Sequence, residues 1–235
     1  MDLVSPDIYI DIHTHTPKVQ DGVIQLINLF PEQVAEKLPA FSFPPIQSND
    51  NNSLFTLGLH PWYIKEENYS NYLKIIEEES LRPEIVAIGE CGLDRVCDTP
   101  FDLQLNVFRQ QVMISEKNRK PLLIHCVRAS NEVIRIKKEL KPQMPWIIHG
   151  YNSNLVTGQE LIRHGFYLSL GMDLLNLFSN AFRFLKEIPK DQLFFETEDE
   201  KIGVESIYKR AASLLEIDLI LLKKQIYSNF KKVYK

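Results

Sequence analysis

Two histidines that could hold a metal ion stand near the start of the chain, in the run YIDIHTH from Tyr9 to His15. Alternating β-branched and apolar residues predict a buried strand, and residues two positions apart on an extended backbone point to the same face. His13 and His15 can therefore reach one metal ion together. The alternative is a polar strand end with two incidental imidazoles, and the pair alone does not decide between them.

Further ligand-type residues follow predicted strands downstream, namely His60, Glu90, His125, His149 and Glu198. Five of the six histidines occupy such strand ends, and parallel barrels carry their chemistry at those ends. Imidazole and carboxylate ligands with no cysteine in register are typical of Mg, Mn or Zn sites. Because the ligands exceed the needs of one ion, we expect two divalent metal ions bridged by Glu90, with a metal-activated water as nucleophile.

The elements that must position these residues alternate regularly. Strand candidates cover residues 9–15, 22–29, 54–59, 85–89, 122–125, 146–149, 166–170 and 193–195. Helical patterns cover residues 66–80, 101–118, 130–140, 154–164, 180–188, 204–215 and 218–233. Short apolar strands alternating with amphipathic helices predict an α/β fold, a single-domain (β/α)8 TIM-like barrel over residues 1–235. Its second helix would be truncated or missing, since residues 31–52 are irregular; a doubly wound open sheet is the alternative.

Composition narrows the class of protein. The chain has 235 residues, of which 44% are hydrophobic and 25% are charged, as in an ordinary globular protein. Its net charge of -4 means that no overall positive potential attracts nucleic acid. No apolar run approaches the roughly 18 residues that span a bilayer, and no basic segment precedes an apolar core near the first residue. Three cysteines suit reduced thiols rather than a disulfide framework. We therefore expect a cytoplasmic protein with no membrane association and no obligate protein partner.

In order and spacing, several motifs resemble those of the TatD family of metal-dependent hydrolases, within the amidohydrolase-like superfamily. The matching segments are residues 11–15, 58–61, 87–94, 121–126, 148–150 and 196–198. The resemblance implies a barrel, divalent metal ions, and deoxyribonuclease or related phosphodiesterase activity on DNA ends or short single strands. Carried across by motif, the metal ligands would be His13, His15, Glu90, His125 and His149.

The last ligand is where this chain departs from the family pattern. The family has an aspartate in a Glu-Thr-Asp run, whereas this chain has Glu198, followed by Asp199. Glu198 could bind through a different rotamer, or a register slip could present Asp199 instead. The resemblance also makes His60 a phosphate-facing group, so that the catalytic candidates are Glu90, Glu198 and His60.

Other residues carry weaker predictions, each with a structural alternative. His60 could instead cap a tight turn before Pro61, and Arg128, expected to begin the next helix, could contact a phosphate or simply cover the helix surface. Asp94 could orient a ligand histidine or cap the helix that starts near Phe101. Three aromatic residues could stack on a base or pack at the rim: Trp62, Tyr63 and Tyr151.

Two other functions stay open at this point. One is an amidohydrolase-type reaction on a small amide or ester, although enzymes of that kind often bridge their metals with a carboxylated lysine where this chain has Glu90. The other is a non-catalytic metal-binding relative, for which the glutamate at position 198 is the only support.

Overall fold

The computed structural model describes residues 7–16, 21–35 and 53–234, and the chain divides into two compact units. The first unit comprises Met1–Ile27 and His149–Lys235, and the second comprises Asn28–Ile148. The prediction that residues 1–235 form one domain stays a prediction. Of the irregular stretch expected over residues 31–52, everything after residue 35 lies outside the described residues.

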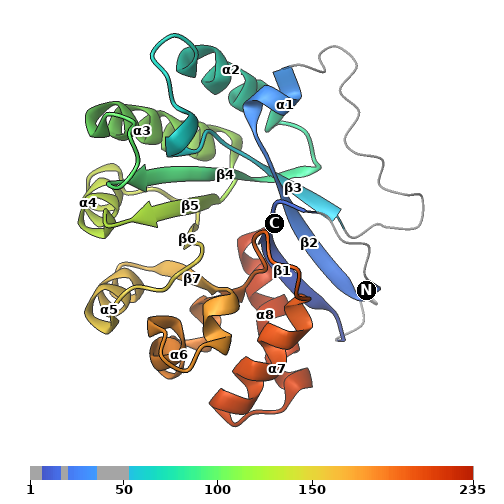
Figure 1. Ribbon diagram of the computed structural model, residues 1–235. Coiled ribbons are helices and arrows are strands. Elements are labelled where there is room, and N and C mark those ends of the chain that lie inside the picture. Colours follow the sequence, from blue (N-terminus) through green and yellow to red (C-terminus); the bar gives the residue numbers. More distant parts are fainter. Residues whose placement is uncertain (1–6, 17–20, 36–52, 235) are drawn as a thin grey trace. The chain divides into compact units, whose positions relative to one another are not determined.

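The first unit is built on parallel strands covered by helices. Its strands are β1 (Tyr9–Thr14), the start of β2 (Val23–Leu29), β7 (Phe166–Leu170) and β8 (Leu193–Phe195). Its helices are α5 (Leu155–Arg163), α6 (Asn180–Phe184), α7 (Val204–Leu215) and α8 (Leu219–Val233). Helices α7 and α8 pack beside β1 (Figure 1). The buried Tyr208 hydroxyl of α7 donates to the Ile10 carbonyl and accepts from the Ile10 amide, which anchors β1 against the helix.

The second unit repeats the same construction. Its strands are β3 (Ser53–Leu57), β4 (Ile85–Asp94), β5 (Leu122–Val127) and β6 (Trp146–Ile148). Its helices are α1 (Pro31–Ala35), α2 (Tyr69–Glu79), α3 (Phe101–Asn118) and α4 (Ser130–Leu140). Strands that are consecutive in the chain pair in parallel, from β3 through β4 and β5 to β6. The strands are nearly continuous apolar runs because both of their faces are buried.

The eight predicted strands and seven predicted helices occur in the predicted order over the described residues, with shifts at some ends, and the short helix α1 (Pro31–Ala35) is an addition to them. The largest shift is in β4, which was expected to end at residue 89 and continues to Asp94. It continues because residues 91–94 pair with residues 124–127 of β5. The helix predicted over residues 180–188 is instead α6 followed by the 3-10 turn Leu185–Glu187.

Within residues 7–16, 21–35 and 53–234, no helix combines the length and the apolar character that crossing a bilayer requires.

Candidate functional site

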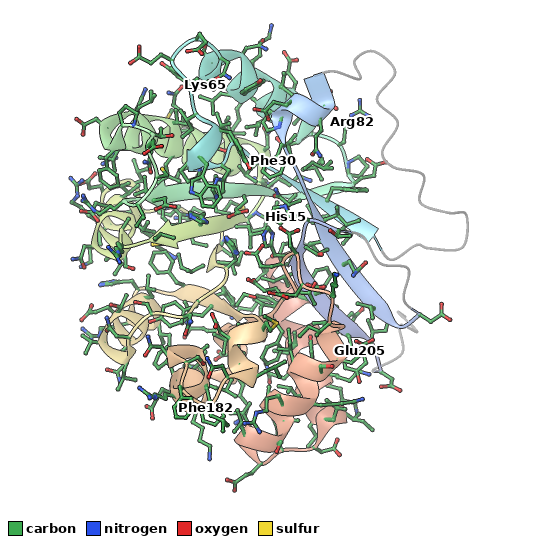
Figure 2. The ribbon with its side chains drawn as sticks, in the orientation of Figure 1. His15, Phe30, Lys65, Arg82, Phe182 and Glu205 are labelled. Carbon is green, nitrogen blue, oxygen red and sulfur yellow. The ribbon has the colours of Figure 1, made fainter. Side chains whose placement is uncertain are left out.

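In the first unit, three imidazoles converge on one carboxylate. His13 lies in β1, His15 lies just beyond its end (Figure 2), and Glu198 and His149 come from loops that follow β8 and β6 in the sequence. Glu198 Oε2 lies 3.2 Å from His13 Nε2 and 3.4 Å from His15 Nε2. Its other oxygen, Oε1, lies 3.0 Å from His149 Nδ1. The predicted histidine pair therefore shares one carboxylate with a third imidazole from a distant part of the chain.

The backbone of Glu198 is fixed against β1. The Glu198 amide donates to the His13 carbonyl, and the Glu198 carbonyl accepts from the Thr14 hydroxyl at 2.8 Å and from the His15 amide at 3.3 Å. Glu198 has a φ of 55°, a left-handed conformation that is uncommon for a residue with a long side chain. Asp199 is exposed, whereas the Glu198 carboxylate faces the histidines. Of these two carboxylates, it is therefore that of Glu198 that lies against the histidines.

The pKa values of two carboxyl groups at this cluster are shifted in opposite directions, that of Glu198 downward and that of Asp11 upward. Burial acts to raise the pKa of Glu198, but hydrogen bonds with His13, His149 and His15 outweigh it and hold the pKa well below its usual range. Burial raises the pKa of Asp11 to about 7, against the lowering effect of two bonds from Thr197. The Thr197 amide and hydroxyl donate to Asp11 at 3.0 and 2.7 Å. Asp11 therefore ties β1 to the segment that carries Glu198.

Glu196 belongs to this cluster and was not predicted as a site residue. It is fully buried, its Oε1 accepts from the Gly150 amide at 2.6 Å, and the same oxygen lies 3.4 Å from His149 Nδ1. With Glu198 and Asp173 it lines a cavity of about 260 Å³. The available signal was the spacing, because Glu196 and Glu198 are two positions apart, like His13 and His15.

In the second unit, Glu90 gathers two further histidines. Glu90 Oε1 lies 3.2 Å from His60 Nε2 and 2.9 Å from His125 Nδ1. The other nitrogen of His125, Nε2, lies 3.1 Å from Asp94 Oδ2. Both nitrogens of His125 are thus engaged by carboxylates, which fixes the orientation of its ring.

His60 and Asp94 are also held by Trp62. His60 Nδ1 accepts from the Trp62 amide at 3.2 Å, so His60 caps the 3-10 turn Pro61–Tyr63, and in a neutral ring the proton sits on Nε2, toward Glu90. Asp94 accepts from the Trp62 indole at 2.7 Å. Burial acts to raise the pKa of Asp94, but bonds from Trp62, the Val96 amide and His125 outweigh it and lower the pKa.

The structure decides between the two interpretations of Asp94. The residue before α3 at the N-cap position is Pro100, so the prediction that Asp94 caps this helix is wrong, and the carboxylate faces His125 instead. Arg128 is exposed in the loop before α4, which begins at Ser130, so Arg128 precedes that helix rather than beginning it.

Buried amides support the second cluster, and sequence reasoning missed them. Asn28 Oδ1 accepts from the Glu90 amide at 2.6 Å and from the Thr56 hydroxyl at 2.9 Å. Gln104 accepts from the Asp94 amide and donates to the Asp94 carbonyl. The only signal was polarity at positions where the strand and helix patterns call for apolar residues.

Of the three aromatic candidates, Tyr151 is 4% exposed and its hydroxyl donates to the Asn154 carbonyl, so its ring packs in the interior. Trp62 and Tyr63 are 57% and 43% exposed.

The donor atoms in each unit suit a metal ion. Among the described residues, with each unit taken by itself, ligand atoms within 4.8 Å of one another include three sets: His13, His15 and Glu198; His149, Glu196 and Glu198; and His60, Glu90 and His125. Imidazole nitrogens with carboxylate oxygens are ligands that Zn and Mn accept, and the span of each set fits the coordination sphere of one ion.

Comparison with known proteins extends these observations. The uncharacterized metal-dependent hydrolase YabD of Bacillus subtilis is 36% identical over 128 residues, covering 52% of this chain and 49% of that protein. The deoxyribonuclease Tat-D of Schizosaccharomyces pombe is 26% identical over 156 residues, covering 61% of this chain and 50% of that protein. The matched part of the chain thus spans about half the length of these curated relatives.

Among solved structures, the TatD homologue YjjV of Escherichia coli superposes with a TM-score of 0.83 at 19% identity, covering 98% of this chain and 99% of that one. With eight parallel strands in sequential order among the described residues, this likeness confirms the predicted (β/α)8 barrel as the fold class. A family model described as TatD related DNase matches residues 45–235, most of the sequence. The chain belongs to the TatD related DNase family of metal-dependent hydrolases.

Proposed function

We propose that this protein is a divalent-metal-dependent phosphodiesterase that acts on DNA ends or short single strands. The observation that carries the proposal is the Glu198 carboxylate, whose oxygens lie within 3.4 Å of three imidazole nitrogens. In support, the fission-yeast relative is named a deoxyribonuclease. The proposed metal ligands are His13, His15, Glu90, His125, His149 and Glu198.

The chain's own residues would hold the ions and orient the substrate. When bound, divalent ions supply Lewis acidity and a nucleophilic water at neutral pH. The Glu198 carboxylate, which lies among three imidazoles, is the proposed last ligand and also the candidate group to take or relay a proton. His60 is also proposed to face the phosphate, for which the N–H at Nε2 would have to turn from Glu90 to a phosphate oxygen. The exposed guanidinium of Arg128 can add charge-assisted bonds.

Hydrolysis of a short single-stranded oligodeoxynucleotide tests the proposal. We expect activity with Mg²⁺ or Mn²⁺, its loss with EDTA, and a fall of about a hundredfold or more in His125→Gln and His149→Gln, since losing a ligand weakens the metal site. The matched control is His164→Gln, because this sixth histidine ends α5 beside Glu160 and should leave activity unchanged. Activity that survives both EDTA and His125→Ala would contradict the proposal.

Metal stoichiometry tests the cofactor prediction separately. We expect elemental analysis of the purified protein to find two ions per chain, and loss of one in the double variant His13→Gln/His15→Gln. A protein that retains no divalent ion after loading with Mg²⁺, Mn²⁺ or Zn²⁺ would instead be a non-catalytic relative.

One observation favours a second candidate, the hydrolysis of a small amide or ester. The cavity of about 260 Å³ beside Glu196 is lined by four carboxylates (Asp173, Glu196, Glu198 and Glu200), a surface that repels a polyanion. A substrate panel of nucleotides, cyclic amides and lactones separates the two candidates: turnover of the neutral compounds alone would replace the phosphodiesterase assignment.

A further inference from the structure

Trp62 is an exposed tryptophan that is held in one orientation. Its indole N–H donates to Asp94 at 2.7 Å, and its own amide donates to the capping nitrogen of His60. Its ring meets the His60 ring edge-to-face at a centroid distance of 5.0 Å. Even so, 57% of the residue stays exposed. A large aromatic face held rigidly in solvent beside a set of ligand-type side chains is typical of a binding surface.

We propose that Trp62 is a stacking site for an unpaired nucleobase of the substrate strand. The inference rests on the proposed function, because it places a base-binding residue beside His60, Glu90 and His125, which that function proposes as site residues. Base–aromatic stacking tolerates every sequence, since each base has a π-face. A ring already held by the hydrogen bond from its indole N–H to Asp94 loses little conformational entropy when a base binds.

Tyr63 supplies a second ring next to Trp62. It is 43% exposed, its ring centroid lies 5.7 Å from that of His60, and it meets Phe30 (Figure 2) edge-to-face at 5.2 Å. The 3-10 turn Pro61–Tyr63 therefore carries two partly exposed aromatic residues. Successive bases of a single strand offer free faces to such rings, whereas paired and stacked bases inside a duplex do not. Trp62 would thus favour single-stranded substrates over duplexes.

Fluorescence gives a direct readout of base stacking at Trp62. The sequence has two tryptophans, and Trp146 is fully buried, so the variant Trp146→Phe leaves Trp62 as the only reporter. The probe is a phosphorothioate oligodeoxyadenylate, which resists cleavage, added in the presence of Mn²⁺. We expect saturable quenching with this strand and none with an abasic phosphorothioate strand of the same length. Binding of the base-carrying strand, seen by anisotropy of a label on it, with no quenching would overturn the proposal.

Two substitutions separate the ring of Trp62 from its hydrogen bond. Trp62→Phe and Trp62→Leu both remove the indole donor to Asp94, so they should share any fall in kcat, but only the leucine variant lacks an aromatic face. We expect KM for a single-stranded oligonucleotide to be about tenfold higher in Trp62→Leu than in Trp62→Phe, and equal in the two for an abasic strand. Equal KM values on both strands would overturn the proposal.

The outcomes also separate this inference from the proposed function. Hydrolysis of the abasic strand with no quenching by the base-carrying strand would retain the phosphodiesterase and overturn the stacking site. Quenching by the base-carrying strand without hydrolysis would retain the stacking site and overturn the phosphodiesterase. Absence of both responses would overturn both.

Discussion

At the scale of single residues, Glu198 is the position on which the proposed metal site depends most. Its left-handed backbone, tied to His13 and Thr14, carries a side chain long enough to reach three imidazoles. A residue held in a sparsely populated conformation is typical of a functional site, because the surrounding bonds must stabilise it.

Shortening this side chain should therefore weaken the metal site. In Glu198→Asp the carboxylate loses one methylene, so its oxygens cannot keep all three imidazole contacts, and we expect metal affinity to fall about tenfold. Isothermal titration with Mn²⁺ measures the change. Asp199→Asn is the matched control, since Asp199 is exposed and should leave the affinity unchanged. A larger loss in Asp199→Asn than in Glu198→Asp would assign the ligand to Asp199.

Spacing and type predicted the histidine pair, and the structure brings His13 and His15 to one carboxylate. The same reasoning missed Asn28 and Gln104, because they bond to backbone groups of residues distant in the sequence, Glu90 and Asp94. No local pattern records such a partner. Reasoning from the sequence also could not decide whether Glu198 or Asp199 faces the histidines, since that depends on the left-handed φ of Glu198.

At the scale of elements, β4 and β5 approach so closely that they admit no side chain at Gly92. A Cβ there would lie 1.9 Å from the His125 carbonyl oxygen, and φ is +151°. The close approach sets the register Gly92↔His125, and with it the position of the His125 ring beside Glu90.

We expect Gly92→Ala to lower the free energy of unfolding by about 3 kcal/mol or more, because overpacking and backbone strain add. Gly165→Ala is the control: φ is +71° but nothing lies within 4 Å of the new Cβ, so backbone strain alone should cost about 1 kcal/mol. Urea unfolding of both variants measures the difference. Equal losses of unfolding free energy in the two variants would show that β5 can shift to make room for a side chain at position 92 and that the close approach is not rigid.

Helix α4 carries a lysine whose charge is disfavoured. Burial lowers the pKa of Lys137 from 10.5 to about 8. Below about pH 8 both the folded and unfolded states carry the charge, and the fold bears its full burial cost. Between about pH 8 and 10.5 the unfolded state binds more protons than the folded state, so the wild type gains stability as pH rises.

Lys137→Met should therefore be more stable than the wild type near neutral pH, with an advantage that shrinks as pH rises above about 8. Urea unfolding of the two proteins at neutral and alkaline pH measures this trend. An advantage that stays constant over this range would mean that Lys137 titrates normally in the fold.

At the scale of the whole molecule, the fold was more predictable than the site. Alternating apolar strands and amphipathic helices are local patterns, so the order of these elements follows from the sequence. Helices α3 (Phe101–Asn118) and α4 (Ser130–Leu140) even have the predicted bounds. Strand ends depend on pairing across the sheet, and β4 extends to Asp94 only because β5 offers partners. Because the net charge is -4, attraction of the proposed phosphate substrate would depend on metal ions and a few cationic side chains.

Metal binding should also stabilise the whole fold. Ions that bind the native ligand sets and not the unfolded chain raise the free energy of unfolding by about 2.7 kcal/mol at roughly a hundredfold excess over Kd. Thermal unfolding with and without Mn²⁺ measures the gain, which His149→Gln should reduce. An equal gain in that variant would place the ion away from the Glu198 cluster.

The first unit is assembled from residues 1–27 and 149–235, and Thr14 pairs with Glu198 across 184 positions. On a ribosome adding about 5–20 residues per second, His13 and His15 emerge on the order of ten to forty seconds before their carboxylate. A nascent chain therefore presents its first two imidazoles with no native acidic partner. Any metal ion that binds the proposed ligand set of this cluster can therefore meet all of its ligands only after residue 198 has left the ribosome.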